Sequence, residues 1–142
     1  MFAKQLSVFI ENRQGRLGEV LNVLGEHGVN ILSMSLADTT EYGLLRLIVN
    51  DPELGKEELT AAGFSSLLSD VLVLQIPHQA GSLQKLLKCI EEAGVNIEYM
   101  YGLSIDGAEA YVVLKASDVS KMEKVLSDNG VKTLTNDQIK AL

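Results

Sequence analysis

Two loops of this sequence carry residues that could bind the carboxylate group of a small ligand. They span residues 11–17 and 77–83, and each places a glycine, Gly15 or Gly81, directly before a run with helical periodicity. Glycine lets the backbone approach a ligand closely, and the first amides of a helix point outward at the positive end of its dipole. Glycine equally suits an ordinary turn from strand to helix, which is the commoner role of a single loop of this kind.

An asparagine follows each predicted helix, Asn30 in the first half of the chain and Asn96 in the second. Its amide offers donors and an acceptor to a zwitterion, although asparagine also suits a chain that is leaving a helix. The loop and the asparagine of one half lie at opposite ends of the same helix. One ligand could therefore contact a loop and an asparagine only where two copies of such a half pack edge to edge. We expect the site to lie at that interface.

The loops and asparagines occur twice because the chain is a duplication. The block Gly-Val-Asn-Ile at 28–31 returns 66 positions later at 94–97, and the glycines and apolar stripes keep the same offset. After Asp51 the offset becomes 67, which predicts a one-residue insertion within 50–58 or its counterpart. The period exceeds the roughly 20 to 50 residues of solenoid and propeller units. We predict two domains, 1–69 and 70–142, joined only through Ser69 and Asp70 and packed as a fixed pair.

Hydrophobic periodicity predicts that each half folds as βαββαβ. Apolar residues alternate in the opening segments, 6–10 and 72–76, and a helical stripe follows each glycine loop. Later strands are expected over 31–36, 44–49 and 64–68 and over 97–103, 110–114 and 131–134, with hairpins at 39–43 and 106–107. Asp51 and Asp118 are expected to cap the second helices. The predicted class is α+β, with two tandem ferredoxin-like domains whose helices cover one face of an antiparallel sheet.

Both faces of the predicted sheets carry apolar residues. Six of them fall on the alternation opposite to that of the expected core: Phe9, Met34, Leu36, Val71, Val73 and Met100. Helices can cover only one face, so the other is expected to meet the sister domain or another chain. We predict a homodimer.

The composition is that of a folded, acidic protein. Of the 142 residues 46% are hydrophobic, and the formal net charge of −7 opposes binding to nucleic-acid phosphates or to an anionic membrane. The first residues show neither a signal peptide nor a membrane span, so a cytoplasmic protein is expected. The single cysteine, Cys89, lies beside an apolar helix stripe and is expected to be packed and inert.

Residue patterns typical of enzymes are weak. His27 and His78 are the only histidines, no serine lies in a nucleophile elbow, and neither a Walker loop nor a metal-spaced cluster occurs. Tyr99 and Tyr101 could stack on RNA bases, but the acidic charge opposes that function. We therefore expect no catalytic residue, no metal and no cofactor.

Both halves of the sequence resemble the ACT domain. In that family an Asp or Asn, an Arg, a Pro and a Gly usually follow the first strand, and Gly-Val/Ile-Asn-Ile follows the helix. Residues 11–17, Glu-Asn-Arg-Gln-Gly-Arg-Leu, match this pattern closely except that Gln14 replaces the proline. The second half keeps Gly81, Leu83 and residues 94–97 but has His-Gln-Ala at 78–80, so the resemblance does not imply equal ligand affinity in the two halves.

The resemblance implies a non-catalytic regulatory protein that binds a free amino acid at the interface of paired ACT domains. By position, Asn12 and Asn30 would contact the amino acid in one site and His78 and Asn96 in the other, while amides after Gly15 and Gly81 would bind its carboxylate. The complete implied set is Asn12, Gly15, Arg16, Leu17, Asn30, Ile31, His78, Gly81, Ser82, Leu83, Asn96 and Ile97. Because no catalytic domain is recognisable in the sequence, the protein is expected to act on a separate enzyme of amino-acid metabolism.

Two other functions stay open at this point. The ACT pairs could serve only to join chains, with a ligand pocket that has decayed. The fold also hosts acylphosphatase-like enzymes, for which Arg13 in the first loop is a slender argument. Stabilisation by a free amino acid would favour the sensor over both.

Overall fold

The computed structural model describes residues 2–11, 13–38, 42–103 and 109–142. Contacts within the chain divide it into two compact units, residues 4–69 and residues 70–142 together with residues 1–3. Asn12, residues 39–41 of the expected first hairpin and the turn expected at 106–107 lie outside the described residues.

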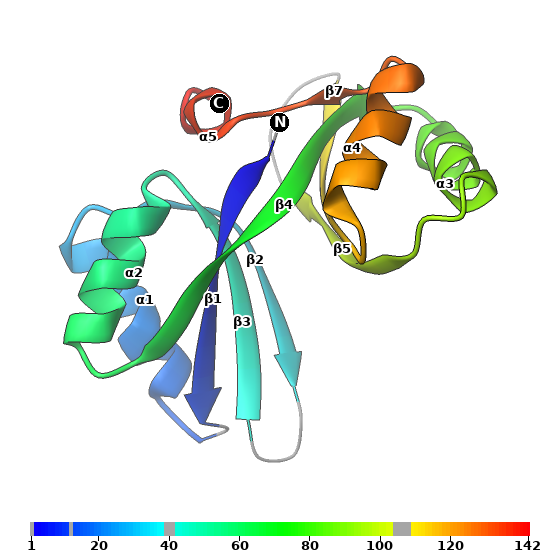
Figure 1. Ribbon diagram of the computed structural model, residues 1–142. Coiled ribbons are helices and arrows are strands. Elements are labelled where there is room, and N and C mark those ends of the chain that lie inside the picture. Colours follow the sequence, from blue (N-terminus) through cyan, green and yellow to red (C-terminus); the bar gives the residue numbers. More distant parts are fainter. Residues whose placement is uncertain (1, 12, 39–41, 104–108) are drawn as a thin grey trace. The chain divides into compact units, whose positions relative to one another are not determined.

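Residues 4–69 form a sheet with two helices against one face (Figure 1). The strand order is β2-β3-β1-β4, and β3 runs antiparallel to both of its neighbours. As predicted, Asp51 caps the second helix, since its side chain accepts a hydrogen bond of 3.2 Å from the amide of Leu54. The elements are β1 (Ala3–Glu11), α1 (Arg16–Glu26), β2 (Ile31–Asp38), β3 (Tyr42–Val49), α2 (Pro52–Ala61) and the first residues of β4 (Ser65–Pro77).

Residues 70–142 repeat this arrangement, with strand order β7-β4-β6-β5 and α3 packed against α4. Asp118 caps α4 by accepting a 3.0 Å hydrogen bond from the amide of Lys121. One helix was not predicted: α5 begins with a capping box formed by Thr135 and Gln138, a spacing that the sequence does contain. The elements after β4 are α3 (Ser82–Glu92), β5 (Ile97–Leu103), β6 (Glu109–Ala116), α4 (Val119–Asp128), β7 (Lys132–Thr133) and α5 (Asn136–Lys140).

Each unit has its own aliphatic core between sheet and helices. Alternate strand residues and one stripe of each helix supply it, as the two periodicities predicted. The largest fully buried members are Leu6, Leu24, Leu45, Leu47 and Leu59 in the first unit and Leu72, Leu74, Ile90, Leu114, Met122 and Leu126 in the second. The predicted fold class, two tandem βαββαβ units with antiparallel sheets, is confirmed.

A continuous strand replaces the expected linker at Ser69 and Asp70. β4 runs without interruption from Ser65 to Pro77, and the division between the units falls inside it. Neither glycine nor proline occurs between these ends, so nothing in the local sequence forces the strand to stop.

β-Bulges place three apolar residues on the face opposite to the one expected. The register shifts by one residue at the start of β2 and again at the start of β5. The resulting cross-strand pairs are Met34–Leu47, Leu36–Leu45 and Met100–Leu114. Because paired residues share a face and these partners belong to the cores, Met34, Leu36 and Met100 lie on the helix-covered side. The expectation was wrong for these three.

Strand pairing also moves the inserted residue to another place. Ile10 pairs with Gly43, and the equivalent Ile76 pairs with Ala110, so equivalent positions of β3 and β6 differ by 67. The second strands, β2 and β5, still differ by 66. The insertion therefore lies in the connection between the second and third strands and not within 50–58, where it was expected.

Candidate functional site

Both glycine loops end in a left-handed glycine. Gly15 has φ 87° and Gly81 has φ 86°, and each is the N-cap of its helix without a side-chain cap hydrogen bond. Other residues are strained at such a φ angle, so glycine is required here by the turn itself. The glycines alone do not distinguish a ligand loop from a structural turn.

The first turn of α3 offers amides to its surroundings. The amide of Ser82 donates to the carbonyl of Gln79 at 3.2 Å, and that of Lys85 donates to the carbonyl of Gly81 at 3.0 Å. The amides of Leu83 and Gln84 lie between these two bonds, where a helix provides no partner of its own. α1 repeats the pattern at equivalent positions.

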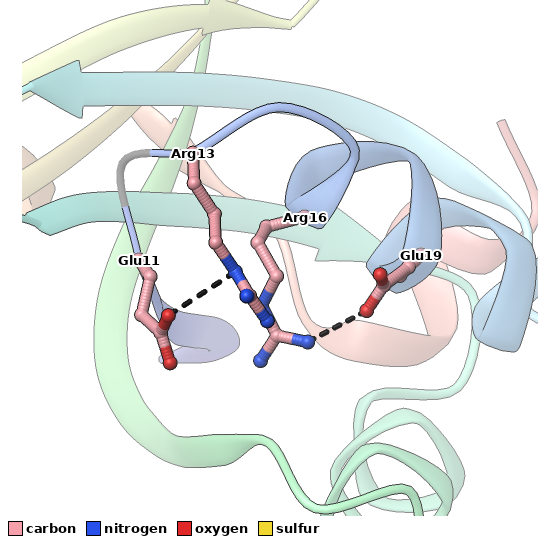
Figure 2. A network of polar contacts seen from close by, with 4 residues as sticks. All are labelled: Glu11, Arg13, Arg16 and Glu19. Atoms are coloured by element: carbon pink, nitrogen blue, oxygen red, sulfur yellow. Dashed lines mark hydrogen bonds and ion pairs between the residues drawn. The ribbon is translucent and has the colours of Figure 1, made fainter.

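Ion pairs surround the loop at the start of α1 (Figure 2). Nε of Arg13 lies 3.2 Å from Oε2 of Glu11, and Nη1 of Arg16 lies 2.6 Å from Oε2 of Glu19. The Arg16 guanidinium also lies over the ring of Phe64, with Cζ 4.4 Å from the ring centroid, and its side chain is only 19% exposed. Arg16 is therefore held by packing and charge within its own unit.

A pocket of about 360 Å³ lies beside the loop at the start of α3. Exposed polar residues, among them His78 and Gln79, meet a buried apolar wall that includes Ile76 and Val112. This combination is typical of small-molecule sites. The complete lining is Ile76, Pro77, His78, Gln79, Ala80, Ser82, Leu83, Ala110 and Val112.

Asn30 and Asn96 tie the chain end after each helix to the end of the third strand. The amide of Asn30 donates to Oδ1 of Asn50 at 2.8 Å, and the amide of Asn50 donates back to the carbonyl of Asn30 at 3.1 Å. In the second unit Nδ2 of Asn96 donates to Oγ of Ser117 at 3.3 Å. Asn50 and Ser117 occupy equivalent positions, and neither was singled out from the sequence because the pairing of residues about 20 positions apart has no local signal.

The structure gathers some predicted site residues and separates others. His78, Ser82 and Leu83 line the pocket, and Gly81 stands between them in the chain. Asn96 lies beyond the far end of α3, whose 11 residues span about 16 Å. Leu17, Ile31 and Ile97 are partly buried and pack against the cores of their units.

The other candidates have structural surroundings. Nε2 of His27 lies 3.0 Å from Oε2 of Glu58, so this histidine joins α1 to α2. Cys89 is a half-buried free thiol on α3. Over the described ranges, no group of three or more His, Cys, Asp or Glu residues could hold a metal ion. Nor does any helix in the described part of the chain have the length and apolar character needed to cross a bilayer.

Comparison with known families decides the relationship. The profile of a family described as an ACT domain pair matches residues 1–142. The chain belongs to this family. The resemblance that the two halves of the sequence showed is thereby confirmed.

Solved structures extend the comparison for this ACT domain pair. It is similar to a protein of Bacteroides thetaiotaomicron, with TM-score 0.94 and 36% identity over 100% of this chain and 98% of that one. Regulatory subunits of aspartate kinase from Thermus thermophilus and Thermus flavus have TM-scores of 0.63 and 0.60 at 16% identity. Each match covers 88% of this chain, with 91% and 90% of the Thermus chains, and at such identity it shows a shared fold. A comparison with curated protein sequences gave no significant match.

Proposed function

We propose that this ACT domain pair is a non-catalytic, allosteric regulator that binds a free amino acid and modulates a separate enzyme in the cytoplasm. The observation that carries the proposal is the pocket beside the loop of α3, where exposed polar groups and a buried apolar wall meet next to a helix start whose first amides have no helical partner. A free amino acid needs these three surroundings for its carboxylate, its ammonium group and its side chain. Two neighbours of the same fold are named as regulatory subunits of aspartate kinase, which supports the regulatory part of the proposal.

The proposed site takes residues from two ACT domains. The amides of Leu83 and Gln84 bind the carboxylate, and His78 contributes a polar contact. Asn30 or Asn96 of a second domain completes the site, because the loop and the asparagine of one unit lie at opposite ends of a helix. We propose that a homodimer supplies this pairing, and that Asn12, Gly15, Arg16 and Leu17 form the corresponding loop in the first unit.

A thermal-shift series with the twenty amino acids tests the function. A ligand that binds only the folded chain stabilises it by RT ln(1 + [L]/Kd), about 2.7 kcal/mol at a hundredfold excess over Kd. We expect at least one amino acid to raise the melting temperature at millimolar concentration. The variants Asn30→Ala and Asn96→Ala should then weaken that ligand tenfold or more at the site each asparagine completes, measured by calorimetry.

The control variant is Asn22→Ala. Asn22 lies on the exposed side of α1, where it donates to Glu26 at 3.2 Å, so this change alters an exposed asparagine away from both loops. Its ligand affinity should equal that of the parent chain. Asn30→Ala retains both hydrogen bonds that the backbone of residue 30 makes with Asn50. A loss of affinity in this variant would therefore not arise from a loss of folding.

A role limited to joining chains is the second candidate. It is favoured by apolar side chains of the first unit that are about half exposed, namely Phe9 at 45%, Met34 at 42% and Leu36 at 48%. A flat response to all twenty amino acids, together with a stable complex with a partner enzyme, would support this function and contradict the sensor.

A further inference from the structure

A glycine of β5, Gly102, stands next to one wall of the pocket beside the loop of α3. Gly102 pairs with Val112, which forms part of the pocket wall. Since paired residues share a face, a side chain at position 102 would project on the pocket side of the sheet. A Cβ added to Gly102 would meet no atom within 4 Å, so the space beside it is free.

The first unit has a leucine at the equivalent place. Leu36 pairs with Leu45 in the way that Gly102 pairs with Val112. A Cβ added to Gly43 would lie 3.3 Å from Cδ1 of Leu36 and 3.1 Å from Cγ1 of Ile10. Leu36 and Ile10 therefore cover Gly43, which is the counterpart of the pocket residue Ala110.

Three replacements on the strands change the volume at this part of the sheet. From the first unit to the second, Leu36 becomes Gly102 and Leu45 becomes Val112, which together remove five side-chain carbons. Ala110 in place of Gly43 returns one carbon. The net loss of four carbons corresponds to a leucine side chain, so the second unit lacks the group that covers this corner in the first.

The lining of the pocket indicates the chemical class of its occupant. Ile76 and Val112 are buried, Leu83 and Ala110 add further apolar surface, and none of the described lining residues is Asp, Glu, Lys or Arg. A charged side chain placed there would lose water without gaining an opposite charge. The volume of about 360 Å³ lies near the lower end of the roughly 300 to 1,000 Å³ found for ligand pockets, which suits a single amino acid.

We propose that Gly102 determines which unit accepts the ligand's side chain: the pocket of the second unit takes an aliphatic amino-acid side chain, and Leu36 closes the equivalent place in the first. This inference rests on the proposed amino-acid binding and adds a ligand class and a specificity-determining residue to it. It makes the two repeats unequal in the aliphatic side chain that they accept.

The test is the variant Gly102→Leu, which gives the second unit the leucine of the first. Gly102 has no left-handed backbone angle and room for a Cβ, so the variant is expected to fold. With L-valine, L-leucine and L-isoleucine as calorimetric probes, the tightest of the three should lose at least tenfold in affinity. The reciprocal variant Leu36→Gly, in the other unit, should leave that affinity undiminished.

The outcomes separate this inference from the function on which it rests. If none of the twenty amino acids binds the parent chain, both are overturned. If an aliphatic amino acid binds and Gly102→Leu leaves its Kd unchanged, the pocket assignment is wrong while the sensor function stands; binding of L-aspartate or L-lysine alone overturns the ligand class. Should circular dichroism show that Gly102→Leu is unfolded, Val112→Leu narrows the same pocket with the residue of the first unit and is judged by the same criterion.

Discussion

The two units fill nearly the same backbone with different side chains in their cores. Gly55 lies in the core-facing side of α2, where an added Cβ would come within 3.0 Å of Cδ2 of Leu6, whereas the equivalent residue of α4 is the fully buried Met122. Conversely, Phe64 after α2 corresponds to the smaller Val131 after α4. Each unit thus combines one large and one small residue at these two positions. Volume lost at one core position is matched at another, as close packing requires.

The edge of the sheet behaves differently from the core. There the side-chain volume lost when Gly102 replaces Leu36 is compensated only by the methyl group of Ala110. The second unit has a pocket beside these residues. A void inside a core is destabilising, but a hollow at an exposed rim is filled by water at little cost. Duplication therefore leaves the rim, and not the core, free to diverge in shape.

The largest effect should come from Met122→Ala, which empties a fully buried position of the second core. Removal of a buried methionine side chain costs about 3 kcal/mol of unfolding free energy through lost burial and the cavity left behind. Urea denaturation followed by circular dichroism measures it. Met34→Ala is the control, since its 42% exposed side chain should contribute less than about 0.5 kcal/mol. Similar losses of unfolding free energy in both variants would show that the volume balance within the core does not explain the effect of Met122→Ala.

A smaller loss is expected when the first unit receives the second unit's residue in Gly55→Met. The new side chain overpacks against Leu6 and Leu24, at a cost of roughly 1 to 3 kcal/mol that a gain in helix propensity of about 1 kcal/mol partly offsets. The same change at Gly25, an exposed position of α1 with no neighbour within 4 Å of an added Cβ, should be neutral or stabilising. The change in unfolding free energy, measured by denaturation, is expected to have opposite signs in the two variants. Changes of the same sign would refute the close approach of α2 to the core.

The smallest effect concerns the loops. Arg16→Ala removes the contact with Phe64 and the pair with Glu19, which together should contribute about 1 kcal/mol, with the Glu19 share reduced in high salt. Ser82→Ala, at the equivalent position, should stay within about 0.5 kcal/mol. If denaturation gave equal losses for the two variants, the loops would not differ in how firmly their side chains are held.

Most of the fold could be predicted from the sequence because its signals are local. Apolar periods of two and near 3.6, the caps at Asp51 and Asp118 and the recurring Gly-Val-Asn-Ile block act over a few residues each. The bulges that turn Met34 and Met100 toward the helices could not be predicted from the sequence, because a register shift is visible only in the pairing of two strands. The same pairing was needed to place the inserted residue.

The loops of the candidate site were predicted at the right places in the fold, whereas the pocket beside one of them was not. The loops with Gly15 and Gly81 stand at helix starts as expected, since a left-handed glycine before a helix has a clear sequence signature. The pocket beside the second loop was not predicted, because it is formed by residues of a loop, a helix and two strands that meet only in the folded chain. A residue-by-residue comparison of the two halves would have pointed to this part of the sheet, because it aligns Leu36 with Gly102 once the offset is known.

The thirteen-residue strand β4 has a consequence for any attempt to obtain half of this protein. Since the seam of the duplication lies within a strand, separating the halves there severs a strand and not a loop. Each fragment would end in a stub of extended chain whose unpaired amides and carbonyls invite a neighbouring molecule to pair with them. The duplicated chain is therefore hard to divide again into single domains. The two separated halves would exchange strands or aggregate before they could function alone.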